Sequence, residues 1–104
     1  MVVEYIRYVI EPERAAHFEQ AYRRAAEVLA ADPHCLGYEV ARGVEEPANF
    51  VVRIEWDSLA GHEQGFRTSP RFGEFFAAVK EFFPQIHEMK HYAVRVAADP
   101  TPQP

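Results

Sequence analysis

The chain has 104 residues, of which 48% are hydrophobic and 26% charged, and its formal net charge at pH 7 is −5. This length fits one globular domain, and the composition is too apolar for a disordered chain. The negative charge and the lack of a Lys/Arg run argue against nucleic acid as a partner, because that binding depends on neutralising phosphates.

Cysteine content and hydropathy exclude further classes of protein. Cys35 is the one cysteine, so neither an internal disulfide nor a thiolate metal site can form within one chain. No apolar run approaches the roughly 20 residues of a membrane helix. The first ten residues alternate polar and apolar, unlike the continuous apolar segment of a signal peptide. We therefore expect no membrane partner and a cytoplasmic location.

The first half of the chain predicts three strands and one long helix. Residues 2–10 alternate in the manner of a strand. Apolar residues then recur at helical spacing over about 13–31, and the following Asp32-Pro33 ends the helix. Residues 35–42 and 49–56 have the character of two strands joined by a hairpin loop.

The second half predicts two helices and a last strand. A short helix is expected over about 57–65. A second helix over about 69–83 begins with a Ser-Pro pair, and the next proline stops or kinks it. Residues 89–96 form the last strand of one domain over 1–96. We expect the proline-bearing tail, 97–104, to be mobile.

The alternation places two kinds of side chain on opposite faces of the expected sheet. One face is apolar and aromatic and collects Ile6, Tyr8, Tyr38, Val40, Phe50, Val52, Ile54 and Trp56. The other face carries charges that allow cross-strand ion pairs, namely Arg7, Glu39, Arg53 and Glu55. An antiparallel sheet with helices on one side should bury the first face, while the second meets water or a partner sheet.

Four segments together resemble the antibiotic biosynthesis monooxygenase family. They are VEYIRYVIEPE, GYEVARGVEEPANFVVRIEWDS, GFRTSPRFGEFF and the closing EMKHY. The strongest marks are Trp56, at the end of the third strand, and the SPRF turn into the last helix. The resemblance covers about residues 2–96. Within the family, the chain is most similar to a bacterial branch in which some members are joined to truncated globins.

The resemblance implies a ferredoxin-like α+β monomer, with an antiparallel sheet and helices on one face. Two such subunits would pack sheet to sheet as a homodimer, the dimeric α+β barrel. A pocket is implied between sheet and helices. In the quinone-forming members, a polycyclic phenol binds there and reacts with O₂ without metal or flavin. The implied function is a cofactor-independent monooxygenase acting on a small aromatic or quinol-like compound.

Three residues are candidates for catalysis in such a pocket. Trp56 matches the family's strand tryptophan and would be a wall for an aromatic substrate, or alternatively a core anchor. His62 lies about where the quinone-forming members have a tyrosine, and a pKa near 6.5 suits an acceptor of a phenol proton. Arg67 would hold a phenolate or carboxylate, or else pair with a surface glutamate. The expected substrate-binding residues are Tyr8, Tyr38, Phe66 and Phe72.

Two alternatives stay open beside the oxygenase. Val52 stands where the quinone-forming members have an asparagine that handles oxygen. That difference leaves room for a non-catalytic ligand-binding or accessory module, associated with a haem protein or a stress response. The second alternative is an isomerase or cyclase-like reaction in which His62 transfers a proton.

A metal site is not expected from the sequence. His87 and His91 flank Glu88, but spacing of four suits a helix, and two ligands on a strand make a weak site. Haem-degrading relatives hold iron through a histidine on the last long helix, and the matching residues 74–77 include none.

Overall fold

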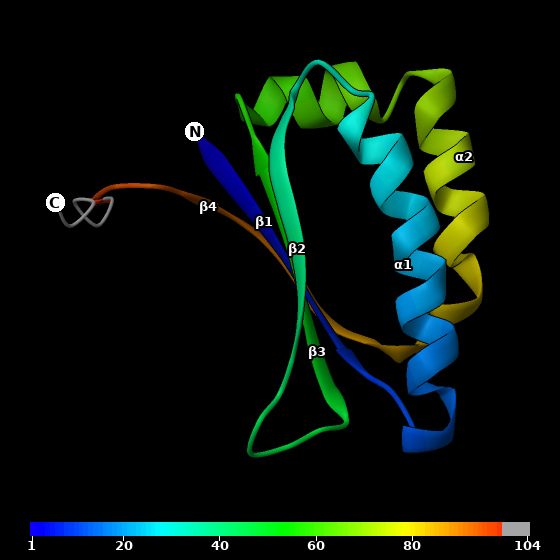
Figure 1. Ribbon diagram of the computed structural model, residues 1–104. Helices are drawn as coiled ribbons and strands as arrows, with labels where there is room; N and C mark the ends of the chain where they lie inside the picture. Colours follow the sequence, from blue (N-terminus) through cyan, green and yellow to red (C-terminus); the bar gives the residue numbers. More distant parts are fainter. Residues whose placement is uncertain (99–104) are drawn as a thin grey trace, which may run out of the picture.

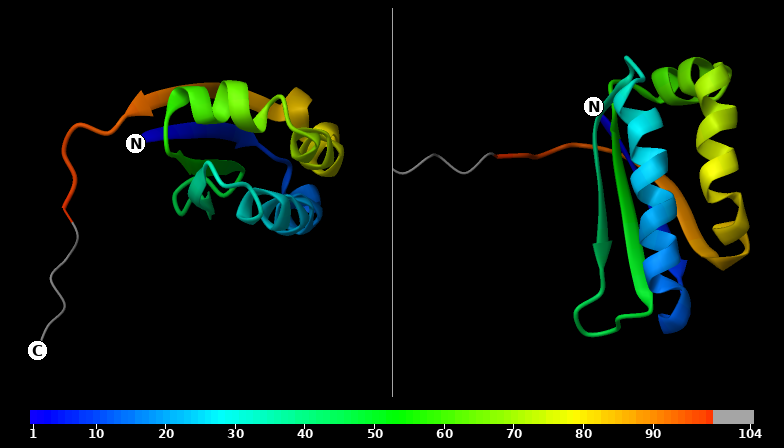
Figure 2. Two further views of the ribbon diagram at one scale, coloured as in Figure 1. Left: turned by 90° about the horizontal axis from the view of Figure 1, so that it is seen from above. Right: turned by 45° about the vertical axis from the view of Figure 1, so that its right-hand side comes forward.

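The computed structural model describes residues 1–98, which form an antiparallel sheet with helices on one face (Figure 1). The four strands are β1 (Val2–Val9), β2 (Cys35–Arg42), β3 (Asn49–Trp56) and β4 (Ile86–Ala93). The helices α1 (Ala15–Ala30) and α2 (Pro70–Val79) lie on the same side of the sheet, also when the molecule is seen from above (Figure 2). The predicted ferredoxin-like α+β fold is confirmed.

Three short helical segments join these elements: η1 (Pro12–Arg14), η2 (Gly61–Phe66) and η3 (Lys80–Gln85). The second predicted helix is shorter than expected, because α2 ends at Val79 and continues as the 3-10 turn η3 with Pro84 inside it. Proline has no N–H for the α-helical bond to the carbonyl four residues earlier, so an α-helix does not continue through it.

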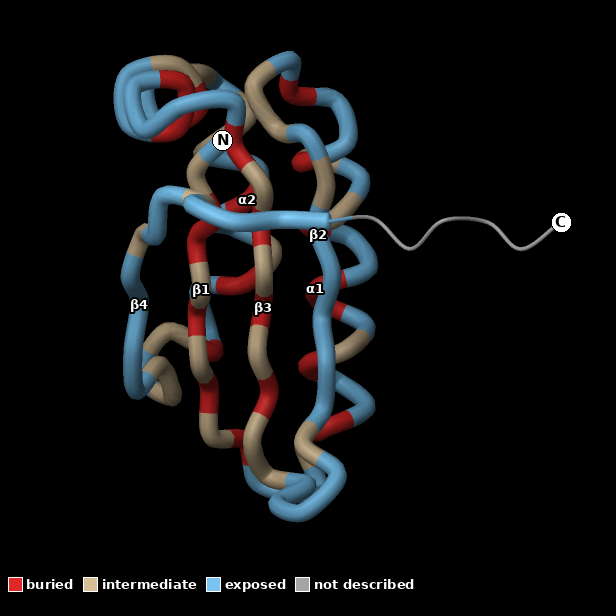
Figure 3. The backbone as a smooth tube through the Cα atoms, turned by 90° about the vertical axis from the view of Figure 1, so that its left-hand side faces the viewer, coloured by how far each residue is buried: buried red, intermediate tan, exposed pale blue. Residues whose placement is uncertain are grey.

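The strand order is β2-β3-β1-β4, so β1 and β3 are central and the other two are edges. Both central strands are antiparallel neighbours, with Ile6 opposite Val52 and Tyr8 opposite Phe50. Figure 3 shows buried residues alternating along β1 and β3, whereas β2 and β4 are mostly exposed. Burial therefore follows position in the sheet as well as side-chain type.

The last strand is placed three residues earlier than predicted. β4 occupies Ile86–Ala93 instead of 89–96, because η3 is compact and delivers the chain to the sheet at Ile86, opposite Tyr8. The ladder ends where Ala93 meets Val2, and just beyond it the Val94 N–H donates a hydrogen bond to the Met1 carbonyl oxygen at 3.2 Å. The expected mobile tail lies mostly outside the described residues, which end at 98.

An aromatic core joins the helices to the central strands. The Phe18 ring of α1 lies 4.8–5.2 Å, centroid to centroid, from the rings of Tyr8, Tyr22, Phe50 and Phe82. The predicted apolar face is buried on β1 and β3. It is not buried on β2, where Tyr38 is 40% and Val40 38% exposed. An edge strand has a neighbour on one side only, and a hollow between α1 and β2 leaves these two side chains partly open to solvent.

The opposite face of the sheet carries the expected charges in a different pairing. Arg53 and Glu55 form an ion pair at 2.5 Å along one strand, where pairs between strands were expected. On the same face, the rings of Tyr5 and Tyr92 pack edge to face, 5.5 Å apart. Over the described range 1–98, the helices are all too short or too polar to cross a membrane.

Candidate active site

A cavity of about 220 Å³ lies under η2 and α2, against the helix-facing side of β1 and β3. Six of the seven predicted site residues line it, namely Tyr8, Trp56, His62, Phe66, Arg67 and Phe72. The remaining wall is largely apolar and includes Ile6, Ile54, Phe75 and Met89. We call this space the Trp56 cavity. One polar corner, containing Glu4 and His62, opens onto it.

Trp56 holds that corner together. Its side chain is fully buried, and its ring stacks on the imidazole of His62 with centroids 4.4 Å apart and an interplanar angle of 12°. The indole Nε1–H donates a hydrogen bond to Glu4 Oε1 at 3.2 Å. The tryptophan is thus both a core anchor and a wall of the cavity, so the two interpretations that the sequence allowed are compatible.

Glu4 is a buried carboxyl group that sequence reasoning did not select. It lies on the helix-facing side of β1 and is 3% exposed. Loss of hydration raises the pKa of this carboxyl group, and the Trp56 hydrogen bond opposes the shift in part. A signal was present in the sequence, because Glu4 alternates with Ile6 and Tyr8 on an otherwise apolar face. An acidic side chain in that position needs a buried partner.

Both ring nitrogens of His62 have partners. Nδ1 lies 2.7 Å from His91 Nε2, and Nε2 lies 3.5 Å from Glu4 Oε1. Burial, and then the neighbouring His91 and Arg67, lower the pKa of His62 to about 4. The imidazole is therefore neutral at pH 7. His91, considered from the sequence only together with His87, joins this corner because Glu4 and His91 are opposite each other in the β1–β4 ladder.

A π-helical turn positions His62 and Arg67. In η2 the Arg67 N–H donates to the His62 carbonyl oxygen at 3.0 Å, a bond across five residues. Such turns are rare in proteins as a whole, and those that occur are often found at functional sites. Gly65 lets η2 pack closely against the turn before β2, since a Cβ there would lie 2.6 Å from the His34 ring. The His34 ring is itself fixed by Asp57, 2.8 Å from its Nδ1.

Tyr8 closes the cavity on the side of α1. Its hydroxyl lies 2.5 Å from that of Tyr22, and both side chains are buried. Burial raises the pKa of Tyr8 to about 12, so the phenol keeps its proton at neutral pH. This pair is therefore a structural wall and not a source of charge in the site.

Comparison with known proteins is consistent with this architecture. Residues 1–78 match the model of the antibiotic biosynthesis monooxygenase family. The chain belongs to that family. One relative of this family member is YczJ of Bacillus subtilis (strain 168), 27% identical over 75 residues, which are 72% of this chain and 79% of YczJ.

Solved structures share the fold of this antibiotic biosynthesis monooxygenase family member. A candidate antibiotic biosynthesis monooxygenase from Bordetella bronchiseptica superposes with a TM-score of 0.79 and 24% identity, covering 91% of this chain and 97% of the other. A mutant of SnoaB, a cofactor-independent oxygenase from Streptomyces nogalater, gives a TM-score of 0.77 with 16% identity, covering 92% and 94%. At these identities the likeness concerns the fold.

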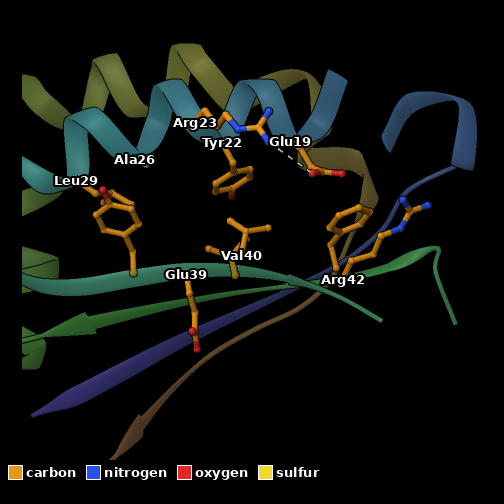
Figure 4. A pocket seen from close by; sticks show the side chains of 11 residues that line it. Glu19, Tyr22, Arg23, Ala26, Leu29, Glu39, Val40 and Arg42 are labelled. Carbon is orange, nitrogen blue, oxygen red and sulfur yellow. Dashed lines mark ion pairs between the residues drawn. The ribbon is translucent and has the colours of Figure 1, made fainter. Parts of the chain in front are cut away.

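Tyr38 lies in a second hollow of this family member, away from Trp56. This space of about 320 Å³ lies between α1 and β2, and Val52 lines it too. Figure 4 shows Tyr22 and Val40 pointing toward each other across it, while Glu39 points away on the far side of the sheet. We call it the α1–β2 groove. Tyr22 lines both hollows, so the Tyr8–Tyr22 pair stands between them.

The arrangement in the Trp56 cavity suits proton transfer to or from a bound ring. A carboxyl group with a raised pKa is a stronger base than an exposed one, and Glu4 lines the cavity. His62 contacts Glu4, and His62 in turn contacts His91, which is partly exposed to solvent. Arg67 supplies positive charge at the same wall. These groups are able to accept a proton and to stabilise the anion left behind.

Proposed function

We propose that this protein is a cofactor-independent monooxygenase that acts on a small phenol or quinol bound in the Trp56 cavity. The observation that carries the proposal is the buried Glu4–His62 pair opening onto an aromatic cavity whose wall also contains Arg67. Such a corner takes a phenolic proton, while the apolar walls exclude water. Membership of the family and the fold shared with an oxygenase support the reaction class.

The size of the cavity restricts the substrate. Pockets for drug-sized ligands measure roughly 300–1,000 Å³, and the Trp56 cavity is smaller, at about 220 Å³. We therefore expect a substrate of one or two rings, in place of the polycyclic phenols of the quinone-forming members. Phe66 and Phe72 offer ring edges and faces to it.

We assign the role of proton acceptor to Glu4 and a supporting role to His62. Both groups line the cavity, but both nitrogens of His62 are engaged by other side chains, whereas the contacts of Glu4 with Trp56 and His62 use the same oxygen, Oε1. The phenolate formed is stabilised by Arg67 and passes an electron to O₂. One oxygen atom of O₂ then forms a bond to the para carbon of the ring. The other oxygen atom leaves as water, together with the two hydrogen atoms that the substrate loses. A phenol with a free para position plus O₂ thus gives a quinone plus water.

A proton-transfer reaction without oxygen is the second candidate, of the isomerase or cyclase type. The chain of Glu4, His62 and His91 favours it, because these groups move a proton whether or not O₂ takes part. Val52 also supports it, since an apolar side chain occupies the position where the quinone-forming members handle oxygen, and it faces the α1–β2 groove.

The homodimer predicted from the family is part of the proposal. We expect two sheets to pack through the face that carries Tyr5, Arg53, Glu55 and Tyr92, which no helix of the described range covers. Sedimentation at micromolar concentration should give twice the mass of one chain. A monomer under these conditions would contradict the barrel.

Oxygen uptake with a panel of one-ring and two-ring phenols and quinols tests the function. We expect uptake that falls at least tenfold in Glu4→Gln and in Trp56→Phe, with His87→Gln, an exposed change on β4, as the matched control. Product formation under strict anaerobic conditions would identify the proton-transfer reaction instead. Tight binding of a panel compound without any turnover would point to an accessory module and would end the oxygenase proposal.

A further inference from the structure

Three donor side chains from three separate elements meet at the polar corner of the Trp56 cavity. They are Glu4 on β1, His62 in η2 and His91 on β4. One ligand atom of each lies within 4.8 Å of the other two. Glu4 and His62 are both 3% exposed, and His91 is half-buried. Charged and ligating groups seldom collect away from water unless something holds them there.

We propose that Glu4, His62 and His91 form a binding site for a divalent transition-metal ion, with Zn²⁺ as the best match. Two imidazoles and one carboxylate are a ligand set that such ions prefer, whereas Mg²⁺ and Ca²⁺ favour oxygen ligands. Zinc sites with three protein ligands leave the fourth position open to water or a small molecule. Here Glu4 and His62 line the cavity, so the open position faces it.

The distances require side chains at the site to reorient when an ion binds, because Glu4 and His91 contact different nitrogens of the His62 ring. Metal–ligand lengths of about 2.0–2.2 Å in a tetrahedron separate the ligand atoms by roughly 3.3 Å. Glu4 Oε1 and His62 Nε2 are 3.5 Å apart, close to that value. His91 Nε2 lies 2.7 Å from the other nitrogen of the same ring, Nδ1. One ion can take only one nitrogen of His62, so binding requires the third ligand to move toward that nitrogen, from a starting point at which one ligand atom of each residue lies within 4.8 Å of the other two. β4 is an edge strand, so His91 has room for this movement.

Two neighbouring side chains have opposite effects on metal binding at this site. The Trp56 Nε1–H bond to Glu4 orients the carboxylate, as hydrogen bonds to ligands do in metal sites. The positive charge of Arg67, whose side chain lines the same cavity, opposes a cation. Replacing Arg67 with Gln should therefore tighten metal binding, which is the opposite of the effect expected for a ligand.

The metal site does not depend on the proposed function. A metal ion on Glu4 and His62 would occupy the proposed proton acceptor, so we expect added Zn²⁺ to inhibit the cofactor-independent reaction. Binding is measured without substrate, so failure of one proposal leaves the other standing. If Zn²⁺ or another divalent ion instead switches oxygen uptake on, the cofactor-independent mechanism is wrong while the site holds.

Isothermal titration calorimetry of the chelator-treated 104-residue chain with Zn²⁺ tests the site. We expect one ion per chain with a dissociation constant in the micromolar range or tighter. Glu4→Gln and His91→Gln should each weaken binding by more than the roughly 10–100-fold that loss of an outer-shell partner costs. Co²⁺ in place of Zn²⁺ should give visible absorption bands of a low-coordinate nitrogen–oxygen site.

His87→Gln is the matched control, since it removes an exposed histidine from the same strand as His91. It should leave the affinity within twofold of wild type. Circular dichroism verifies that each variant is folded before titration. Absence of saturable binding by the folded wild-type protein would overturn the proposal. Equal affinity in wild type and His91→Gln would overturn it too, because the metal would then lie elsewhere.

Discussion

The Trp56 cavity and the α1–β2 groove lie against the same face of one sheet, yet they differ in chemistry. The cavity lies over the central strands and is closed by η2 and α2. The groove lies over the edge strand β2, and its charged side chains stay in water, with Arg23 69% and Glu19 40% exposed. In the cavity, loss of water shifts the pKa of Glu4 and of His62 in opposite directions. Position in the sheet, more than residue type, therefore decides which hollow holds reactive groups.

The largest difference should appear when an aromatic side chain is removed from each hollow. Trp56→Ala deletes a fully buried side chain and its hydrogen bond, so we expect a loss of about 3–5 kcal/mol in unfolding free energy. Tyr38→Ala, in the groove, should cost about 1 kcal/mol or less because the side chain is 40% exposed. Urea unfolding at neutral pH measures both. Equal losses would show that the groove is closed in solution.

Lowering the pH should reveal a second difference, the contribution of the buried His62 ring to stability. In the unfolded chain His62 titrates near its ordinary pKa of 6.5, but in the folded protein its pKa is about 4. Folding thus favours the neutral ring, and this contribution to stability is complete above pH 6.5 and lost as the pH falls toward 4. Each pKa unit corresponds to about 1.4 kcal/mol, so the stability advantage of wild type over His62→Gln should shrink by about 2–3 kcal/mol.

Chelator in both samples keeps this comparison free of metal effects. Glu4 carries a shift of the opposite sign but is present in both proteins, so the difference between them reports on His62. A stability difference that stays constant from pH 7 to pH 4 would contradict the burial of this imidazole.

A smaller effect is expected at the wall between the two hollows. Tyr22→Phe leaves the buried Tyr8 hydroxyl without its partner, which should cost about 1–2 kcal/mol. Tyr8→Phe should cost a similar amount. The double variant should lose less than the sum of the two, because no buried hydroxyl is then left unpaired. Additive losses in this double-mutant cycle would indicate that the hydroxyls do not interact.

The smallest effect belongs to the charged rim of the groove. Arg23 and Glu19 are 4.0 Å apart, one helical turn from each other and exposed. Arg23→Gln should change the unfolding free energy by no more than about 0.5 kcal/mol. Raising the salt concentration should abolish even that difference. A larger change in thermal unfolding would mean that something covers this helix face.

The sequence predicted the elements better than their edges, and it did not predict the polar contacts around His62. Trp56 and His62 were selected through the family resemblance, and the structure places them beside Phe66 at one cavity. Tyr38 was misplaced, since alternation gives the face of a strand but not its position in the sheet. His91 was missed as a neighbour of His62, because the pairing of β4 with β1 depends on how η3 delivers the chain. Long-range register has no local signature.

The Tyr8–Tyr22 pair separates the Trp56 cavity from the α1–β2 groove. Since Tyr22 borders both hollows, a small side chain at this one position would merge them into a single channel running along β3 and open at the β2 edge. A compact chamber for one or two rings would then become a slot for an extended fused-ring system. For the proposed reaction, the length of the substrate would then be set at Tyr22, a residue of α1 that lines the same cavity as Glu4 and His62 but contributes none of the groups assigned to the chemistry.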